Sequence, residues 1–242
     1  MTKLSLAPLV LMTVACGVGK APLSPTVPST SVAAPSAQAA ALFTLSGLVF
    51  ENRAGTRQAV AGAGVVVWGV PCGAAVTLPP GVNNCRTWYS TITGNYLVSD
   101  AEGRFVAPDV PGSVVTIMPA KRGYVQPCAA IVAVHGDLTT EIELVPVESF
   151  NTANPQPLMT TRPLVVGTVF EMTADGPKGV AGASVFIDTD SDLTVADTLT
   201  DLTGRFTLCG GTGGIIYAGK AAYGYSAEAS PVNGMAIEIK RQ

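Results

Sequence analysis

The stretch VAGAGVVVW at residues 60–68 returns as VAGASVFID at residues 180–188. In both places a glycine-containing turn precedes apolar residues at alternate positions, a pattern typical of a strand with one buried face. Extended outward to residues 45–68 and 165–188, the alignment needs no gap and has 10 identities in 24 positions. Chance would give roughly one or two. The identical pairs are Gly47/Gly167, Val49/Val169, Phe50/Phe170, Glu51/Glu171, Ala54/Ala174, Val60/Val180, Ala61/Ala181, Gly62/Gly182, Ala63/Ala183 and Val65/Val185.

Further matches extend the repeat toward its end. SDAEGRF (99–105) matches TDLTGRF (200–206), and we align RGYV (122–125) with YGYS (223–226). DAEG and DLTG are predicted tight turns, in which a glycine takes a positive φ at little cost. Residues 130–145 are predicted to form a hairpin around HGD, and residues 230–240 a second one around Asn233-Gly234. Each copy therefore has about seven short strands, as in a Greek-key sandwich.

These motifs resemble the carboxypeptidase regulatory-like domain, a small sandwich of the transthyretin type. The first copy carries the motif at Gly47, Val49, Val60, Gly62, Ala63, Val65, Ser99, Asp100, Gly103, Phe105, Pro111, Gly112, Gly123, Tyr124 and Leu144. The second carries it at Gly167, Val169, Val180, Gly182, Ala183, Val185, Thr200, Asp201, Gly204, Phe206, Gly224, Tyr225 and Ile239. The resemblance implies spacer, accessory or binding modules and no catalytic residues.

The expected fold is all-β: two tandem Greek-key or prealbumin-like sandwiches after a disordered N-terminal segment. We assign residues 1–15 to a signal peptide, 16–42 to a lipid-anchored flexible tether, 43–147 to the first sandwich, 148–162 to a linker and 163–242 to the second sandwich. The segment from 21 to 40 has four prolines and no charge, so it cannot build a core.

The N-terminus predicts export. Lys3 precedes a short apolar run that is too short to span a bilayer. TVAC at residues 13–16 resembles the lipobox of bacterial lipoproteins, which implies lipid on Cys16 and a location in the cell envelope, at the outer membrane. The alternative is an ordinary secretory signal with an incidental cysteine.

An insertion of 19 residues sets the first copy apart, since Gly62 and Gly103 are 41 residues apart whereas Gly182 and Gly204 are 22 apart. An exported chain permits disulfides, and we predict Cys72–Cys85, which would contribute about 3 kcal/mol by loop closure. Cys128 and Cys209 lie in different copies and would bridge only if the domains pack closely, so we expect them to be free or buried.

Aromatic residues in and beside the insertion are candidate ligand contacts: Trp68, Trp88 and Tyr89. Aromatic rings suit stacking on sugars or gripping a protein partner. The alternative is that Trp68 and Tyr96 belong to the core and the loop merely covers a sheet edge.

Alternating acidic residues at Asp188, Asp190 and Asp192 are a candidate calcium site, because hard cations need clustered oxygens. Leu193 and Leu199 stand where an EF-hand wants glycine and glutamate, so the alternative is a solvated hairpin. No other cofactor is expected. His135 is the only histidine and is predicted to lie in a turn.

Composition excludes several functions. A net charge of -3 without a Lys/Arg cluster gives no footprint for nucleic acid. No nucleophile motif or zinc-ligand spacing is present. The sequence thus predicts a non-enzymatic exported lipoprotein, held at the membrane by lipid on Cys16, that acts as a structural or interaction module toward a surface glycan or protein. The first alternative is a carbohydrate-binding accessory protein that uses the aromatic insertion; the second is an enzyme of unknown type, which would require a deep pocket with convergent polar groups.

Overall fold

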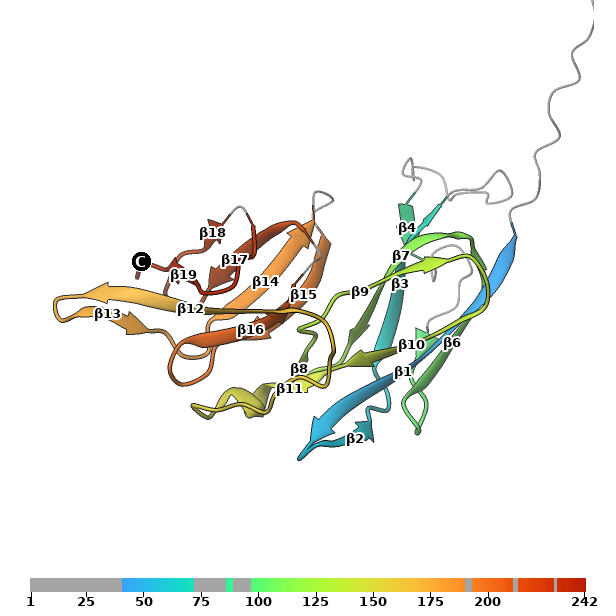
Figure 1. Cartoon of the computed structure of the whole chain (residues 1–242), viewed down its shortest axis with the longest axis horizontal. Helices are drawn as coiled ribbons and strands as arrows, with labels where there is room; N and C mark the ends of the chain where they lie inside the picture. Colours follow the sequence, from blue (N-terminus) through green and yellow to red (C-terminus); the bar gives the residue numbers. More distant parts are fainter. Residues whose placement is uncertain (1–40, 72–85, 89–96, 190–192, 211–212, 229) are drawn as a thin grey trace, which may run out of the picture. The chain divides into compact units, whose positions relative to one another are not determined.

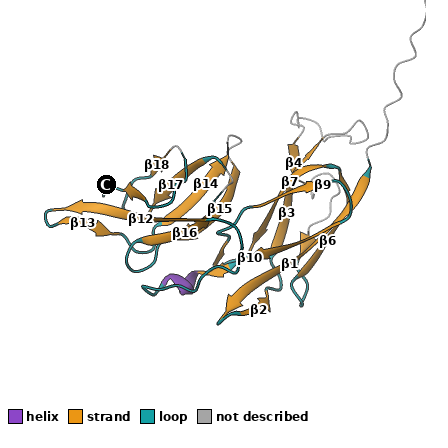
Figure 2. Ribbon diagram, in the orientation of Figure 1, coloured by secondary structure: helices purple, strands orange, loops and turns teal. Residues whose placement is uncertain are grey.

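The computed structural model describes residues 41–71, 86–88, 97–189, 193–210, 213–228 and 230–242 (Figure 1). These residues form strands, apart from loops and one 3-10 turn, η1 (Val147–Phe150), so the predicted all-β class is confirmed (Figure 2). Within these ranges no helix is long and apolar enough to cross a membrane.

The first repeat builds two sheets. In one sheet, β1 pairs with β10 on one edge and with β6 and β2 along the other, and β10 runs parallel to β1. In the other sheet, β3 pairs with β4 and β5 on one edge and with β7 on the other, and β9 lies beyond β7. The strands are β1 (Leu42–Arg53), β2 (Thr56–Ala59), β3 (Gly64–Pro71), β4 (Arg86–Trp88), β5 (Leu97–Val98), β6 (Arg104–Pro111), β7 (Ser113–Ala120), β9 (Ala130–Val134) and β10 (Leu138–Glu143).

The second repeat reproduces this pairing. β12 takes the place of β1 and pairs with β16, β13 and the parallel β19, while the other sheet has the order β15-β14-β17-β18. A short pair, β8 (Tyr124–Val125) with β11 (Val145–Pro146), corresponds to the single bridge between Tyr223 and Arg241. The strands are β12 (Leu164–Thr173), β13 (Gly176–Gly179), β14 (Ser184–Thr189), β15 (Leu193–Leu199), β16 (Arg205–Cys209), β17 (Ile215–Gly219), β18 (Ser226–Glu228) and β19 (Met235–Glu238).

Each repeat has its own hydrophobic core between its two sheets. The first cluster contains only residues from 45 to 144, and it joins alternate residues of β1 to those of β3 and β7. The second cluster is built in the same way from residues 165 to 239, with one exception: Ala129 of the first repeat packs into it and is almost fully buried. The two cores are separate, but the second is completed by the first repeat.

The turn shared by the repeats is held by a buried hydroxyl. Ser99 Oγ donates to Val60 O (2.7 Å) and accepts from Ala63 N (2.9 Å). Thr200 Oγ1 does the same with Val180 O (2.6 Å) and Ala183 N (2.8 Å). Gly103 and Gly204 close the neighbouring DAEG and DLTG turns at φ +75° and +83°, as predicted, and a Cβ on Gly103 would lie 2.4 Å from Val49 O.

Both predicted closing hairpins are wrong. β9 pairs with β7 in one sheet, whereas β10 pairs with β1 in the other, so the turn at His135 crosses between sheets. The turn at Asn233 likewise separates β18 from β19. A hairpin and an arch between sheets have the same alternation of apolar and polar residues, so the pattern could not distinguish them.

The alignment of RGYV with YGYS is shifted by two residues. Lys121 Nζ donates to Ala61 O (2.8 Å) and Lys220 Nζ to Ala181 O (2.6 Å), which makes these lysines equivalent. KRGY (121–124) therefore matches KAAY (220–223). The backbone agrees, because Gly123 and Ala222 both have a positive φ.

Candidate functional site

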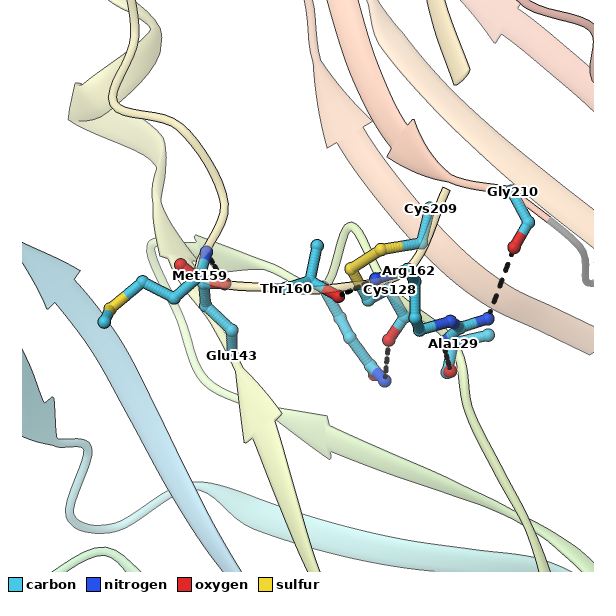
Figure 3. Close-up of a disulfide and its surroundings, with 9 residues drawn as sticks. Cys128, Ala129, Glu143, Met159, Thr160, Arg162, Cys209 and Gly210 are labelled. Carbon is cyan, nitrogen blue, oxygen red and sulfur yellow. Dashed lines mark hydrogen bonds between the residues drawn. A yellow bond between two sulfur atoms is a disulfide. The ribbon is translucent and has the colours of Figure 1, made fainter. Parts of the chain in front are cut away.

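The junction between the repeats carries a disulfide and several hydrogen bonds that have no counterpart within either repeat. Cys128 and Cys209, expected to be free or buried, form a disulfide with Cα atoms 4.8 Å apart (Figure 3). Cys209 is fully buried on β16, where residues 125–129, which we call the junction segment, approach the second repeat. The expectation failed because it required the repeats to stay apart, and they do not.

Arg162 braces both sides of this disulfide. Its Nη1 donates to Ala129 O and its Nη2 to Gly210 O (3.4 Å), which are the carbonyls of the residues that follow the two cysteines (Figure 3). One guanidinium from the segment between the repeats thus holds the backbone of each in place. An arginine suits this role because its donors form a fixed planar fork.

The junction segment also lies against the edge of β15. Asp197 N donates to Gln126 O (2.9 Å), and Gln126 N donates to Asp197 Oδ1 (2.8 Å). Cys209 N donates to Pro127 O (2.9 Å). Burial raises the pKa of the Asp197 carboxyl, and the hydrogen bond from Gln126 opposes that rise. An edge strand of each sheet in the second repeat is thereby partnered by the first repeat.

The predicted linker carries hydrogen bonds to both repeats. Asn52 Nδ2 donates to Pro157 O (3.0 Å), and Met159 N donates to Glu143 Oε2 (2.7 Å). On the other side, Leu202 N donates to Thr152 O (3.2 Å). Burial raises the pKa of Glu143, partly offset by the Met159 hydrogen bond.

The aromatic candidates are brought together only in part. Trp68 is half-buried on the outer face of its sheet, because the core residues Val65 and Val67 take the alternate positions. It is therefore not the core residue of the alternative interpretation. Trp88 stands opposite Trp68 in the β3–β4 register. The side chain of Trp88 and the whole of Tyr89 lie outside the described part of the chain, so their role as ligand contacts stays a prediction.

The acidic candidates are not assembled in the part of the chain that the structure covers. Asp188 Oδ1 accepts from Thr194 Oγ1 (2.6 Å) on the paired strand. Asp190 and Asp192 are outside the described residues, and inside them no three His, Cys, Asp or Glu side chains could share a metal ion. Cys16, Cys72 and Cys85 also lie outside, so calcium, lipid and the Cys72–Cys85 disulfide stay predictions.

Sequence reasoning missed an aromatic cluster on the second repeat. Phe186 on β14 stacks on Tyr217 of β17, with ring centroids 5.3 Å apart, and Tyr225 meets Phe186 edge-on at 6.2 Å. Tyr225 is 74% exposed and its ring lies against Gly219, where a Cβ would clash. The outward positions of Phe186 and Tyr217 in alternating strands could have indicated the pair. Nothing in the sequence pointed to Gln126, Arg162 or Asp197.

No protein-family model matches the chain, and no curated protein matches it. Among solved structures, it is similar to the Bacillus anthracis TIE protein at 12% identity and a TM-score of 0.28, over 83% of this chain but only 34% of that protein. A minor pilin of Streptococcus agalactiae matches at 12% identity, with 83% and 96% of the chains covered and a TM-score of 0.26. The shaft pilin SpaA of Lactobacillus rhamnosus GG matches at 9% identity, with 84% and 98% covered and a TM-score of 0.29. The resemblance to carboxypeptidase regulatory-like domains therefore stays a prediction from the sequence motifs.

Proposed function

We propose that this protein is a non-catalytic module of the bacterial cell surface, in which two carboxypeptidase regulatory-like sandwiches are joined into one rigid structural or interaction unit. The proposal rests on the contacts between the two repeats. A disulfide, the Arg162 brace and the bonds between Gln126 and Asp197 link the repeats, where a flexible connection would need only a free linker. A fixed relation between domains is useful to a spacer that presents a surface at a constant orientation.

Anchoring completes the proposal. Residues 16–42 act as the tether, and lipid on Cys16 holds the module at the outer membrane. Each buried CH₂ contributes about 0.8 kcal/mol, so several acyl chains hold a soluble domain firmly. The partner that the module meets is a surface glycan or another envelope protein.

Residual dipolar couplings measured on residues 41–242 test the rigid unit. Both repeats are expected to share one alignment tensor in the oxidised protein, and the tensors are expected to separate in the Cys128→Ala/Cys209→Ala variant. Different tensors in the oxidised wild type would refute a rigid unit.

Fractionation of cells that express the full chain tests the anchor. The wild type should incorporate labelled fatty acid and sediment with membranes, whereas Cys16→Ala should do neither. Cys128→Ala is the matched control and should remain at the membrane. Recovery of unlabelled wild type in the soluble fraction would reject lipid anchoring.

Carbohydrate binding at the insertion is a second candidate function, and the register of β3 and β4 favours it. Placing Trp68 opposite Trp88 brings two large aromatic residues to one site on a sheet, beside Tyr89 in sequence. Stacking on aromatic rings is a common way to hold sugars. A glycan array probed with residues 41–242 and with Trp88→Ala checks this function, and equal signals from both proteins would exclude it.

A further inference from the structure

A groove of about 270 Å³ lies on the outer face of the β12–β16 pair, beneath the segment from 150 to 158. Leu164, Val166 and Thr207 line it from the sheet, where Val166 and Thr207 are cross-strand partners. Phe150 and Leu158 line it from the segment above. The volume lies just below the range for ligand sites, which are typically about 300–1,000 Å³ and mostly apolar, so the groove suits a small ligand.

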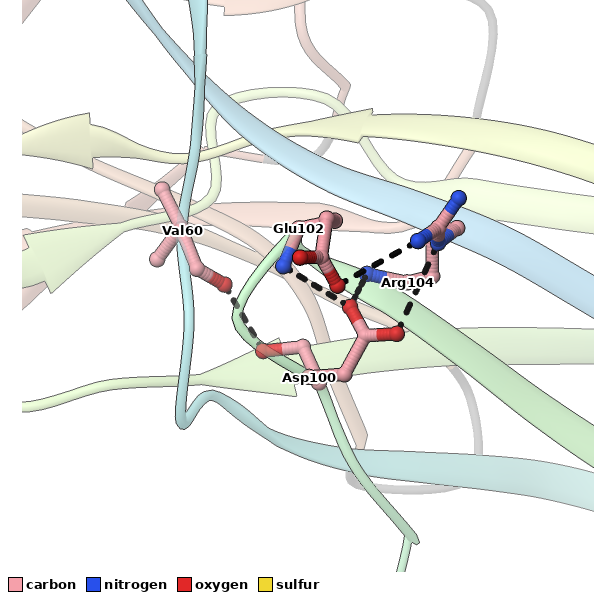
Figure 4. A network of polar contacts seen from close by, with 5 residues as sticks. Val60, Asp100, Glu102 and Arg104 are labelled. Atoms are coloured by element: carbon pink, nitrogen blue, oxygen red, sulfur yellow. Dashed lines mark hydrogen bonds and ion pairs between the residues drawn. The ribbon is translucent and has the colours of Figure 1, made fainter.

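A guanidinium without an ion pair borders this groove. In the first repeat, Arg104 is engaged: its Nε lies 3.5 Å from Asp100 Oδ2 and its Nη2 lies 3.2 Å from Glu102 Oε2 (Figure 4). Arg205 is the equivalent residue in the second repeat, but Thr203 stands in place of Glu102. Among the residues that the structure describes, the Arg205 side chain has no ion pair, and it is exposed.

The nearby carboxylate of Asp201 does not form an ion pair with Arg205. Its Oδ1 accepts three hydrogen bonds within its own turn, from Thr203 N (2.8 Å), Thr203 Oγ1 (2.7 Å) and Arg205 N (3.0 Å). These contacts hold Asp201 as a turn residue and leave the Arg205 guanidinium available to an anion from outside.

The walls of the groove suit an alkyl chain better than a peptide. Pro127, Pro155 and Pro157 line it and have no backbone N–H to offer. The backbones of β12 and β16 are already paired with each other along its floor. A peptide would leave its own N–H and C=O groups without partners there, at a cost of about 1–3 kcal/mol each, whereas a hydrocarbon chain has none to satisfy.

We propose that this groove binds an aliphatic carboxylate, with the alkyl chain along Leu164, Val166 and Leu158 and the carboxylate paired with Arg205. Guanidinium and carboxylate form the strong, charge-assisted kind of hydrogen bond. The described part of the first repeat differs at this place, because Val106, which stands in the position of Thr207, is 54% exposed.

The test titrates octanoate into ¹⁵N-labelled residues 41–242 and follows the amide resonances by nuclear magnetic resonance. Acetate, which has the carboxylate but no long alkyl chain, and octylamine, which has the chain but a positive charge, are the comparison ligands. Octanoate is expected to shift the amide resonances of Val166, Thr207 and Leu158, with little response to acetate or octylamine. Arg205→Gln should weaken octanoate binding about tenfold, the value of one charged hydrogen bond. Arg104→Gln is the matched control and should bind octanoate as the wild type does.

Thr207→Phe fills the groove but keeps the Arg205 guanidinium, and it should abolish the octanoate-induced shifts. A dispersed spectrum for each variant shows that the variant is folded. Three results would overturn the proposal: octanoate shifts confined to other surfaces or absent, equal weakening by Arg104→Gln and Arg205→Gln, or undiminished binding by Thr207→Phe.

Discussion

Single hydroxyl groups hold the corresponding turns of both repeats. Ser99 and Thr200 are buried, and each satisfies one carbonyl and one N–H of the VAGA turn that precedes β3 or β14. Neither backbone group can reach water once its partner is removed, so the loss of the hydroxyl leaves two unsatisfied groups.

We therefore predict that Ser99→Ala and Thr200→Val each lower the free energy of unfolding by about 1–3 kcal/mol. Thr200→Ser keeps the oxygen and should cost much less. Urea denaturation followed by circular dichroism measures all three. If Thr200→Val were no less stable than Thr200→Ser, the hydroxyl would not be what holds the turn.

Asp197 makes the stability of the folded protein depend on pH. Because burial raises its pKa in the folded state, the folded protein binds this proton more tightly than the unfolded chain does. Its contribution to stability is therefore full below the unfolded pKa of about 3.9 and falls as pH rises through the folded pKa. The raised pKa of Glu143 acts with the same sign, while the lowered pKa values of Asp100 and Glu171 act with the opposite sign.

Asp197→Asn isolates this contribution, because an amide oxygen can still accept the Gln126 hydrogen bond and carries no charge. The decline in stability above pH 4 should be smaller in this variant than in the wild type, as measured by denaturation at a series of pH values. Asp175→Asn, at an exposed position, removes the same charge elsewhere. Identical pH profiles for wild type and Asp197→Asn would contradict the assignment.

The sequence was informative about residues whose role is local. Gly103 and Gly204 were predictable because the turn itself demands a positive φ. Asp197 was not, because it looks like any other acidic residue of a hairpin until a segment 71 positions away in the chain covers it. Arg162 was hidden for the same reason, since both of its acceptors are carbonyls in distant segments.

At the scale of elements, alternation located the strands but not their sheets. Both strands of the first failed hairpin exist, whereas in the second only β19 forms and residues 230–232 are no strand. β10 and β19 run parallel to β1 and β12. What directs them is a tie from each crossing turn to the central strand. Asp137 Oδ1 accepts from Thr44 N (2.7 Å), and Asn233 Oδ1 accepts from Val166 N (3.1 Å). A side chain in each crossing turn thus fixes the turn to the central strand of the sheet that the chain enters.

Removing these ties should loosen the last strand of each repeat. We predict that Asp137→Ala and Asn233→Ala each cost about 0.5–1.5 kcal/mol, the net value of one hydrogen bond. Hydrogen exchange should quicken in β10 and β19 respectively, and less in β3 and β14. Exchange that quickens equally in every strand, or in none, would show that the tie does not position the strand.

For the whole molecule, the disulfide is the connection that the sequence could not assign. Four cysteines besides Cys16 allow three pairings, and the choice depends on how closely the repeats pack. Cys128–Cys209 spans 81 residues, so by chain entropy it stabilises the folded state by about 4.5 kcal/mol. The Cys128→Ala/Cys209→Ala variant should lose stability of that order, and calorimetry should resolve separate melting of the two repeats. A single transition at the wild-type temperature would show that the other junction contacts suffice.

The two repeats should differ when they are separated, despite their common design. Every core residue of the first lies between 45 and 144, so residues 41–147 keep their whole cluster. A fragment that begins at residue 163 lacks Ala129, which packs into the core of the second repeat. It also lacks Gln126, which pairs with β15, and the segment that covers Cys209. We predict that residues 41–147 unfold cooperatively, whereas residues 163–242 carrying Cys209→Ser are markedly less stable or aggregate through the bared edge. Urea titrations of both fragments by nuclear magnetic resonance decide this. Equal stability of the two fragments would mean that the junction segment only joins the repeats, and does not complete the fold of the second.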